Sequence, residues 1–487
     1  MRKAKIVCTI GPASASPDVL DQLIACGMNV ARLNFSHGSH ESHARAIRDV
    51  RDAAKRRGVA VAIIQDLQGP RIRVGNLGVE GIDVAQGQHV RLLAGAAPFD
   101  PRRGIHYGAH SVGQSSITEV PVTYPRFAQD VKPGARILID DGLIELRADR
   151  VTGEAVESTV VRGGRISANK GINVPGTLIS EVSPTEKDRE DIRFGVAQGL
   201  DYLALSFVRS PQDIVAARTL VAACGAEIPI IAKIERQEAI DCLEKLLDEA
   251  DGVMVARGDL GVELGPEAVP LLQKHIIAEA NHRRCLVITA TQMLESMTQS
   301  QQPTRAEASD VANAVFDGTD AVMLSAETSV GRYPVEALSV MDRIVRAAEG
   351  GMKPKGPKRR EDETEEGSVP EALCAAASVA SSTIGASAIV AFSQSGATAR
   401  LVSKRRPVAP IVGFTPSEQV RQRMALYHGV VPFTMPWIAS VEERLREVER
   451  RLKDEKLAAA GDRIVVLAGS TSGQQPGTNS MELYQIR

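Results

Sequence analysis

The stretch PIIAKIERQ, residues 229–237, is a short apolar run that ends in two opposite charges. Side chains of a β-strand alternate between its two faces, so Lys233 and Glu235 are predicted to point the same way. A salt bridge at the end of a strand is one explanation for this pair. A functional site is the other, and the remaining sequence bears on the choice.

Seven other apolar runs share the length and character of this one, which is typical of buried parallel strands. Together the eight runs cover residues 5–11, 29–36, 59–67, 201–208, 229–235, 252–260, 285–292 and 320–328. Most gaps between them hold an amphipathic helical pattern, for example residues 16–27, which open with Ser16 as a cap before Pro17. Eight strand–helix units predict an α/β protein with a (β/α)₈ TIM barrel.

The gap after the third strand is anomalous because it exceeds a hundred residues. Residues 70–168 are rich in Gly and Val with short alternating runs, which predicts a small inserted all-β domain. Its place at the catalytic mouth of the barrel is typical of a lid. The barrel then comprises residues 1–69 and 169–349. A charged, Pro- and Gly-rich linker is predicted at 350–373, and a C-terminal α/β domain at 374–487.

Composition excludes several classes of function. The 487 residues include 58 Lys and Arg and 60 Asp and Glu, a net charge of −2, which gives no reason to expect nucleic acid or an anionic membrane as partner. No apolar run has the length of a signal-peptide core or a membrane span. The six cysteines form no CxxC pair, which argues against zinc or a disulfide framework and predicts a cytoplasmic protein.

Polar residues stand at the C-terminal ends of nearly all the predicted strands, where barrel enzymes place their active sites. They are Arg32, Asn34, Ser36, Asp66, Arg71, Arg73, Ser206, Lys233, Glu235, Arg257, Asp259, Thr289, Thr291, Ser325 and Glu327. Because buried charges are costly unless they are paired, stability alone explains such a set poorly, and we predict an active site there.

Glu235 and Asp259 follow neighbouring strands, with no histidine or cysteine beside them. Oxygen-only ligation suits Mg²⁺ or Mn²⁺. The alternative is that these carboxylates pair with Lys233 and Arg257. The glycines of residues 257–265 would let the backbone approach a ligand closely, but glycine-rich turns are common and this signal is weak alone.

Seven segments closely resemble pyruvate kinase, in that family's order over essentially the whole chain: TIGPAS, MNVARLNFSHG, IAKIE, VARGDLGVELG, ATQMLESM, PTRAE and MLSAET…GRYP. The resemblance implies the same three-part architecture and a homotetramer. It implies transfer of a phosphoryl group from phosphoenolpyruvate to ADP, giving pyruvate and ATP in glycolysis. Catalysis of this reaction is mostly positioning and charge neutralisation.

The resemblance also assigns roles to residues. Arg32 matches the arginine that grips the phosphoryl group, and Lys233 the lysine that stabilises the developing enolate. Glu235 and Asp259 match the ligands of Mg²⁺ (or Mn²⁺). The substrate carboxylate site matches Gly258, Asp259 and Thr291, and Thr291 also lies where a proton reaches the enolate carbon. The residues around the nucleotide phosphates match Asn34, Ser36, His37, Arg73 and Lys170. Outside this motif, His37 would read as a surface histidine.

One departure concerns K⁺, which many pyruvate kinases need near the phosphates. They read DTKGPEIR where this chain has DLQGPRIR, residues 66–73, with Arg71 in place of glutamate. The family includes K⁺-independent members that carry a lysine at this position, with Leu and Gln beside the aspartate, and a fixed guanidinium can supply the charge of the ion. We therefore expect an enzyme that needs Mg²⁺ but not K⁺. The alternative is a surface arginine without a catalytic role, which leaves Asn34, Ser36 and Asp66 as K⁺ ligands.

The C-terminal domain contains SQSGAT, residues 393–398, after an apolar run and before a helical pattern. This is a phosphate-cradle arrangement, and Ser393, Ser395, Gly396 and Thr398 resemble the effector loop of the family. Residues 469–480 resemble its second effector loop. Both indicate a sugar-phosphate effector and allosteric regulation, the alternative being a vestigial loop.

Two other functions compete. A metal-dependent aldolase or lyase on the same barrel would also use a Glu/Asp pair, but would lack the β insert and NFSHG. A non-catalytic metabolite-binding scaffold would be expected to have lost the lysine or a metal ligand, and Lys233, Glu235 and Asp259 are all present.

Overall fold

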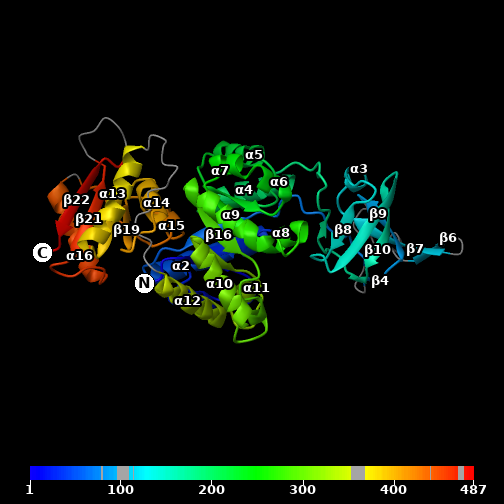
Figure 1. Ribbon diagram of the computed structural model, residues 1–487, viewed down its shortest axis with the longest axis horizontal. Coiled ribbons are helices and arrows are strands. Elements are labelled where there is room, and N and C mark those ends of the chain that lie inside the picture. The colour runs from blue at the N-terminus through cyan, green and yellow to red at the C-terminus, as the bar shows by residue number, and fades with distance from the viewer. Residues whose placement is uncertain (78–80, 96–108, 113–114, 353–367, 439, 470–476) are drawn as a thin grey trace.

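The computed structural model describes the chain except residues 78–80, 96–108, 113–114, 353–367, 439 and 470–476. Figure 1 shows three bodies in a row, with the barrel in the middle, a β-sheet body on one side and the C-terminal α/β body on the other. Across the described part of the chain, no helix has both the length and the apolar character that a membrane crossing requires.

The central body is a closed barrel of eight parallel strands, so the predicted fold class is confirmed. Each predicted run contains one strand. In spatial order around the barrel they are β1 (Lys5–Thr9), β17 (Ala321–Leu324), β16 (Leu286–Ala290), β15 (Gly252–Ala256), β14 (Ile230–Ile234), β13 (Tyr202–Leu205), β3 (Ala62–Asp66) and β2 (Val30–Asn34). Their continuous burial explains why they read as unbroken apolar runs.

Helices cover the outside of the barrel. They are α1 (Pro17–Ala25), α2 (His40–Arg56), α4 (Glu186–Ala197), α5 (Pro211–Ala223), α6 (Gln237–Asp241), α7 (Leu243–Glu249), α8 (Arg257–Leu264), α9 (Val269–His282), η1 (Glu295–Thr298), α10 (Arg305–Asp317), α11 (Ala326–Ser329) and α12 (Pro334–Gly351). The predicted start of α1 is confirmed, because the Ser16 side chain accepts a hydrogen bond from the backbone N–H of Val19 and Pro17 opens the helix.

The insert after β3 forms its own sheet and core. The seven-stranded sheet has the order β12 (Ile172–Asn173), β8 (Arg136–Ile139), β9 (Ile144–Thr152), β10 (Ala155–Arg162), β5 (His89–Ala94), β7 (Ser115–Val122) and β6 (Ala109–Val112). A smaller sheet pairs β4 (Ile82–Val84) with β11 (Gly164–Ile166), and α3 (Phe127–Asp130) adds one helical turn to the predicted all-β body. Because β12 pairs with β8 beyond residue 168, we propose that this domain ends after β12.

The C-terminal body has a sheet with helices. Its elements are α13 (Val369–Ile384), β18 (Ala388–Phe392), α14 (Ala397–Lys404), β19 (Ile411–Thr415), α15 (Glu418–Met424), β20 (Val430–Thr434), α16 (Val441–Asp454), β21 (Arg463–Ala468) and β22 (Ser480–Gln485). The predicted α/β class of this domain is confirmed. Strand β22 is mostly exposed, so its sequence carries little apolar signal. Residues 369–373, within the predicted linker, begin α13, since Ser368 caps a helix in which Pro370 occupies the first turn.

A buried ion-pair group joins the barrel to the C-terminal body. Asp320, which directly precedes β17, lies 2.5 Å from Lys404 Nζ and 2.8 Å from Arg406 Nη2. Burial lowers the pKa of Lys404 to about 8, against the opposing effect of Asp320. The lysine therefore depends on this carboxylate to remain charged at neutral pH.

Asp320→Asn is expected to lower the free energy of unfolding by about 3 kcal/mol, because it leaves the buried Lys404 and the partly exposed Arg406 without their counter-charge. Urea denaturation followed by circular dichroism measures this effect. Asp52→Asn, at an exposed position on α2, is the control and should change the midpoint little. Equal midpoints for the two variants would contradict the prediction.

Candidate active site

Lys233 occupies the centre of a buried charge cluster at the C-terminal ends of β2, β3 and β14. Its Nζ lies 2.9 Å from Glu235 Oε1 and 3.2 Å from Asp66 Oδ1, and donates a 2.8 Å hydrogen bond to Ser206 Oγ. The predicted common direction of Lys233 and Glu235 is thus confirmed. Burial acts to lower the pKa of Lys233, but Asp66 and Glu235 together raise it above its ordinary 10.5. The lysine is therefore a fixed positive charge at neutral pH.

Arg32 joins the same cluster from β2. Its Nε donates a 2.6 Å hydrogen bond to Asp66 Oδ2, and its Nη1 donates a 2.9 Å bond to Thr9 Oγ1. Burial acts to raise the pKa of Asp66, but the charges and hydrogen bonds of Arg32 and Lys233 hold it below 3.8. Asp66 is therefore an ionised carboxylate that fixes the positions of two cations.

The two carboxylate oxygens of Glu235 differ, because only one of them accepts a hydrogen bond from a described residue. Oε2 accepts a 2.6 Å hydrogen bond from the backbone N–H of Phe207. Oε1 is buried and has the Lys233 ion pair but no well-aligned hydrogen bond. Burial raises the pKa of Glu235, and Lys233 opposes this while the charge of Asp259 adds to it. Two repelling carboxylates with an oxygen of incomplete coordination fit a divalent cation.

The described residues contain no group of three or more His, Cys, Asp or Glu side chains arranged to hold a metal ion. Mg²⁺ is commonly bound by one or two carboxylates together with oxygens of the substrate.

Thr291 and Gly258 meet beside this cluster. Thr291 follows β16 with a φ of 65°, and its Oγ1 accepts a 2.8 Å hydrogen bond from the backbone N–H of Gly258, the residue before Asp259. Arg257 fixes the position of this loop, because its guanidinium donates hydrogen bonds to the Thr291 and Gln292 carbonyls.

Arg257 also forms a 2.6 Å ion pair with Asp310. The pairing of Arg257 with Glu235 or Asp259, which the sequence left open, is absent among the contacts of the described residues. Arg257 is therefore a positioning residue for the loop that carries Thr291.

Comparison with known proteins identifies the family. The family model for the barrel domain of pyruvate kinase matches residues 1–338, and the model for its alpha/beta domain matches residues 371–484. The chain belongs to the pyruvate kinase family.

Similar proteins agree over the full length of the chain. The pyruvate kinase of Geobacillus stearothermophilus is 43% identical over 488 residues, covering 100% of this chain and 80% of the relative. That of Mycobacterium tuberculosis is 42% identical over 485 residues, covering 100% and 98%. A crystal structure of a pyruvate kinase from Cryptosporidium parvum superposes with a TM-score of 0.90 at 34% identity, covering 100% and 96%. These findings confirm the resemblance and the enzyme class, a phosphotransferase.

The residues that pyruvate kinase similarity places around the nucleotide fall into two groups. Asn34 and His37 lie on the barrel, and Asn34 Oδ1 accepts a 3.1 Å hydrogen bond from the backbone N–H of Ser36. Arg73 and Lys170 lie on the segments that lead into and out of the insert. Arg73 Nη1 donates to the Asn169 carbonyl, and Lys170 Nζ pairs with Asp140 at 2.9 Å. The side chains of Arg73 and Lys170 therefore both contact residues of the insert.

His37 lies within reach of these cations. Burial lowers its pKa below 6.5, and the charges of Arg73, Arg71 and Arg32 lower it further. The positive charges of Arg73 and Arg71 therefore disfavour the protonated form of His37.

Arg71 itself packs against the insert in this pyruvate kinase. Its Nη2 lies 3.6 Å from Asp141 Oδ1 and next to Gly171, where a Cβ would approach to 3.1 Å. Its side chain is 29% exposed. Arg71 is thus a partly exposed cation at the start of the insert, and its one ion pair with a described residue is the long contact with Asp141.

In the candidate effector loop, Gly396 has a φ of 85° and caps α14, and Ser393 Oγ accepts a hydrogen bond from the Thr398 N–H. Ser395 is exposed. Thr398 Oγ1 lies 2.6 Å from Thr478 Oγ1, so the first loop contacts the end of the second. Residues 470–476 of the second loop lie outside the described residues.

The sequence did not predict Thr9, which contributes to the cluster, and it did predict Glu327 and Thr289, whose contacts lie elsewhere. Thr9, at the end of β1, orients Arg32, and the available signal was a polar residue at the end of a barrel strand. Glu327 is fully buried and accepts hydrogen bonds from the backbone N–H groups of Leu294 and Ser325. Thr289 bonds to Thr319. The contacts of Glu327 and Thr289 are structural.

Proposed function

We propose that the chain transfers a phosphoryl group from phosphoenolpyruvate to ADP with the help of Mg²⁺, held by Glu235 and Asp259. The observation that carries this is the buried cluster in which two cations and the incompletely satisfied Glu235 face one barrel mouth. When bound, Mg²⁺ would neutralise oxygens of the substrates. Mn²⁺ has the same ligand preferences and is expected to replace it.

The side chains of the protein then have separate roles. Arg32 uses Nε and Nη1 for Asp66 and Thr9, which leaves Nη2 for a phosphoryl oxygen. Lys233 supplies a permanent positive charge where negative charge develops on the enolate oxygen. Gly258 and Asp259 begin α8 beside Thr291, where the substrate carboxylate would bind and where a proton would reach the enolate carbon.

The direct test is an assay of pyruvate formation coupled to lactate dehydrogenase, with phosphoenolpyruvate, ADP and Mg²⁺. We expect turnover that requires ADP and the divalent cation. Consumption of phosphoenolpyruvate without ADP would favour a lyase. Absence of turnover, even with sugar phosphates added, would favour a metabolite-binding scaffold.

We further propose that the enzyme needs no K⁺. Two of the three residues that would bind the ion already have partners for their oxygens, because both Asp66 oxygens meet Arg32, Lys233 or Ser206, and Asn34 Oδ1 accepts from the backbone N–H of Ser36. Arg71 lies near enough to affect His37, so its charge can act at the nucleotide side of the mouth. These contacts support the proposal that Arg71 supplies the charge of K⁺.

Arg71→Glu is expected to reduce kcat at least tenfold in K⁺-free buffer, with recovery on addition of K⁺, because the substitution removes one positive charge and adds a negative one. Arg71→Lys is the matched control and should remain active without K⁺. The coupled assay in Na⁺- and K⁺-free buffer measures both. If Arg71→Glu shows no new response to K⁺, Arg71 is a surface arginine without this role.

The wider setting also belongs to the proposal. Similarity to pyruvate kinases supports a homotetramer that works in glycolysis in the cytoplasm. The loop of residues 393–398 supports allosteric regulation by a sugar phosphate, since hydroxyl groups and a helix N-terminus converge there.

A further inference from the structure

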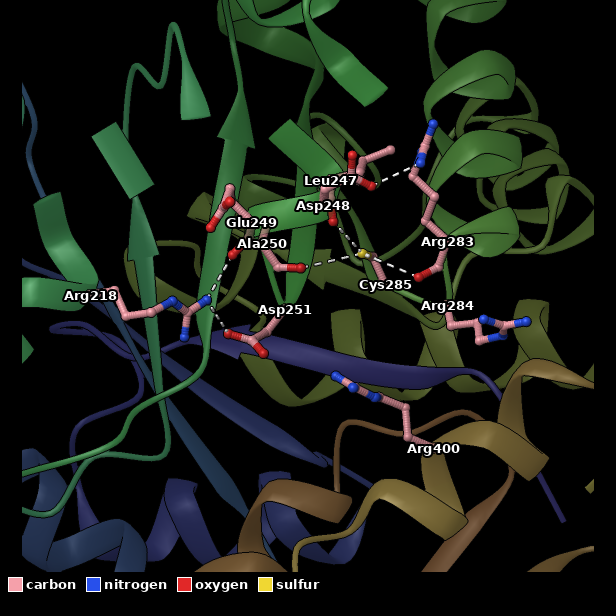
Figure 2. Close-up of a pocket in the computed structure, with 10 residues that line it drawn as sticks. All are labelled: Arg218, Leu247, Asp248, Glu249, Ala250, Asp251, Arg283, Arg284, Cys285 and Arg400. Carbon is pink, nitrogen blue, oxygen red and sulfur yellow. Dashed lines mark hydrogen bonds and ion pairs between the residues drawn. The ribbon is translucent and has the colours of Figure 1, made fainter. Parts of the chain in front are cut away.

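A cavity lies at the end of the barrel opposite to the candidate active site. Its volume is about 530 Å³, within the usual range for small-molecule sites. Residues 247–251 line it just before β15, residues 283–285 line it just before β16, and Arg400 lines it from α14 of the C-terminal body. Figure 2 shows these residues around the cavity, with Arg400 extending toward the barrel residues.

The arginines of this cavity differ in how far they are neutralised. Arg218 donates to Asp251 Oδ2 at 3.0 Å, and Arg283 donates to Asp248 Oδ1 at 2.8 Å. Arg284 pairs with Glu371 of α13 through Nη1, so its other N–H groups can still donate to a ligand. Arg400 is half-buried, and its guanidinium has no hydrogen bond or ion pair with any residue that the structure describes.

An unneutralised, half-buried guanidinium favours an anionic ligand. Burial raises the pKa of the neighbouring Cys285 thiol to about 11, so that group adds no negative charge at neutral pH. None of the ten lining residues is aromatic, which gives no surface for stacking a nucleotide base. Asp248 and Asp251 are acceptors that hydroxyl groups of a ligand could reach.

We propose that this cavity binds a small hydroxylated organic anion, whose phosphate or carboxylate group pairs with Arg400 and Arg284. The ligand would bridge the barrel and the C-terminal body, because these two arginines belong to different bodies. This site is separate from the candidate effector loop, which lies at the start of α14 rather than on its barrel side. The proposal does not depend on the catalytic roles given above.

Helix α14 would connect this cavity to the candidate effector loop and to the ion pair with Asp320 of the barrel. This helix begins next to Gly396 of the effector loop, carries Arg400, and ends at Lys404, which binds Asp320 directly before β17. A ligand on Arg400 would therefore hold α14 against the base of the barrel.

Isothermal titration calorimetry of the full chain tests the proposal with two probes, ribose 5-phosphate for the phosphate class and citrate for the carboxylate class. We expect at least one probe to bind, and its Kd to rise about tenfold in both Arg400→Ala and Arg284→Ala. Arg446→Ala, an exposed arginine of α16, is the matched control and should leave the Kd unchanged. Arg400→Lys keeps the charge and serves if the alanine variant fails to fold; its Kd should rise less than tenfold.

Ser395→Glu separates this site from the effector loop, because it places a negative charge in that loop only. Binding that persists in Ser395→Glu and weakens in Arg284→Ala supports the cavity. Binding that Ser395→Glu abolishes and Arg284→Ala leaves intact assigns the probe to the effector loop and overturns the proposal. Failure of both probes to bind the unaltered chain also overturns it.

Discussion

Lys233→Met is expected to lower kcat for phosphoryl transfer by about a thousandfold, because a preorganised charge next to the reacting oxygens commonly contributes that much. The lysine Nζ lies within 3.2 Å of Asp66 and Glu235, and these carboxylates raise its pKa above 10.5. Its charge, and the stability that the charge adds, are therefore present at neutral pH and are lost only as pH rises above that value. The coupled assay measures kcat.

Lys233→Arg is the matched control for this prediction. It keeps the positive charge but not the position of a single ammonium group, so we expect a smaller loss than in Lys233→Met. Because Lys233→Met also leaves two buried carboxylates with less counter-charge, circular dichroism must show that the variant is folded at the assay temperature. If a folded Lys233→Met enzyme retained a tenth of the unaltered kcat, Lys233 would not have the proposed role in stabilising the developing enolate.

The barrel could be predicted from sequence because its strands are buried on both faces. Runs such as residues 252–256 are continuous apolar segments, and most of them are followed by a segment with the 3.6-residue apolar period of a helix. Strand β22 could not be predicted in this way, since it is an exposed edge strand whose place depends on pairing with β21. The beginning of α13 was assigned to the linker because Pro370 marks a turn as readily as the first turn of a helix.

The sequence predicted which charged residues gather at the candidate site better than it predicted the contacts between them. Strand alternation placed Lys233 beside Glu235, and the ion pair between them bears this out. Periodicity could not show that Arg257 turns away to Asp310, nor that Thr9 orients Arg32. Both depend on how strands distant in sequence meet in the closed barrel.

Glu235→Gln is expected to weaken binding of the divalent cation at least a hundredfold, because it removes the charge of one of only two carboxylate ligands. The amide oxygen can still accept from the Phe207 N–H, so the loop should keep its position. Electron paramagnetic resonance of Mn²⁺ measures the affinity without turnover. Burial raises the pKa of Glu235 above its ordinary 4.5. As the pH falls to this raised pKa, the carboxylate becomes protonated, so Mn²⁺ binding to the unaltered enzyme should weaken there.

Glu263→Gln is the matched control for the metal site. Glu263 is a buried carboxylate of α8, the same helix as Asp259, and burial also raises its pKa, but its contacts are with Gly176 and Arg236. We expect this variant to bind Mn²⁺ as the unaltered enzyme does. If Glu235→Gln and Glu263→Gln bound Mn²⁺ equally well, Glu235 would be an ion-pair partner of Lys233 alone, and the salt-bridge explanation of the strand end at residues 229–237 would be the correct one.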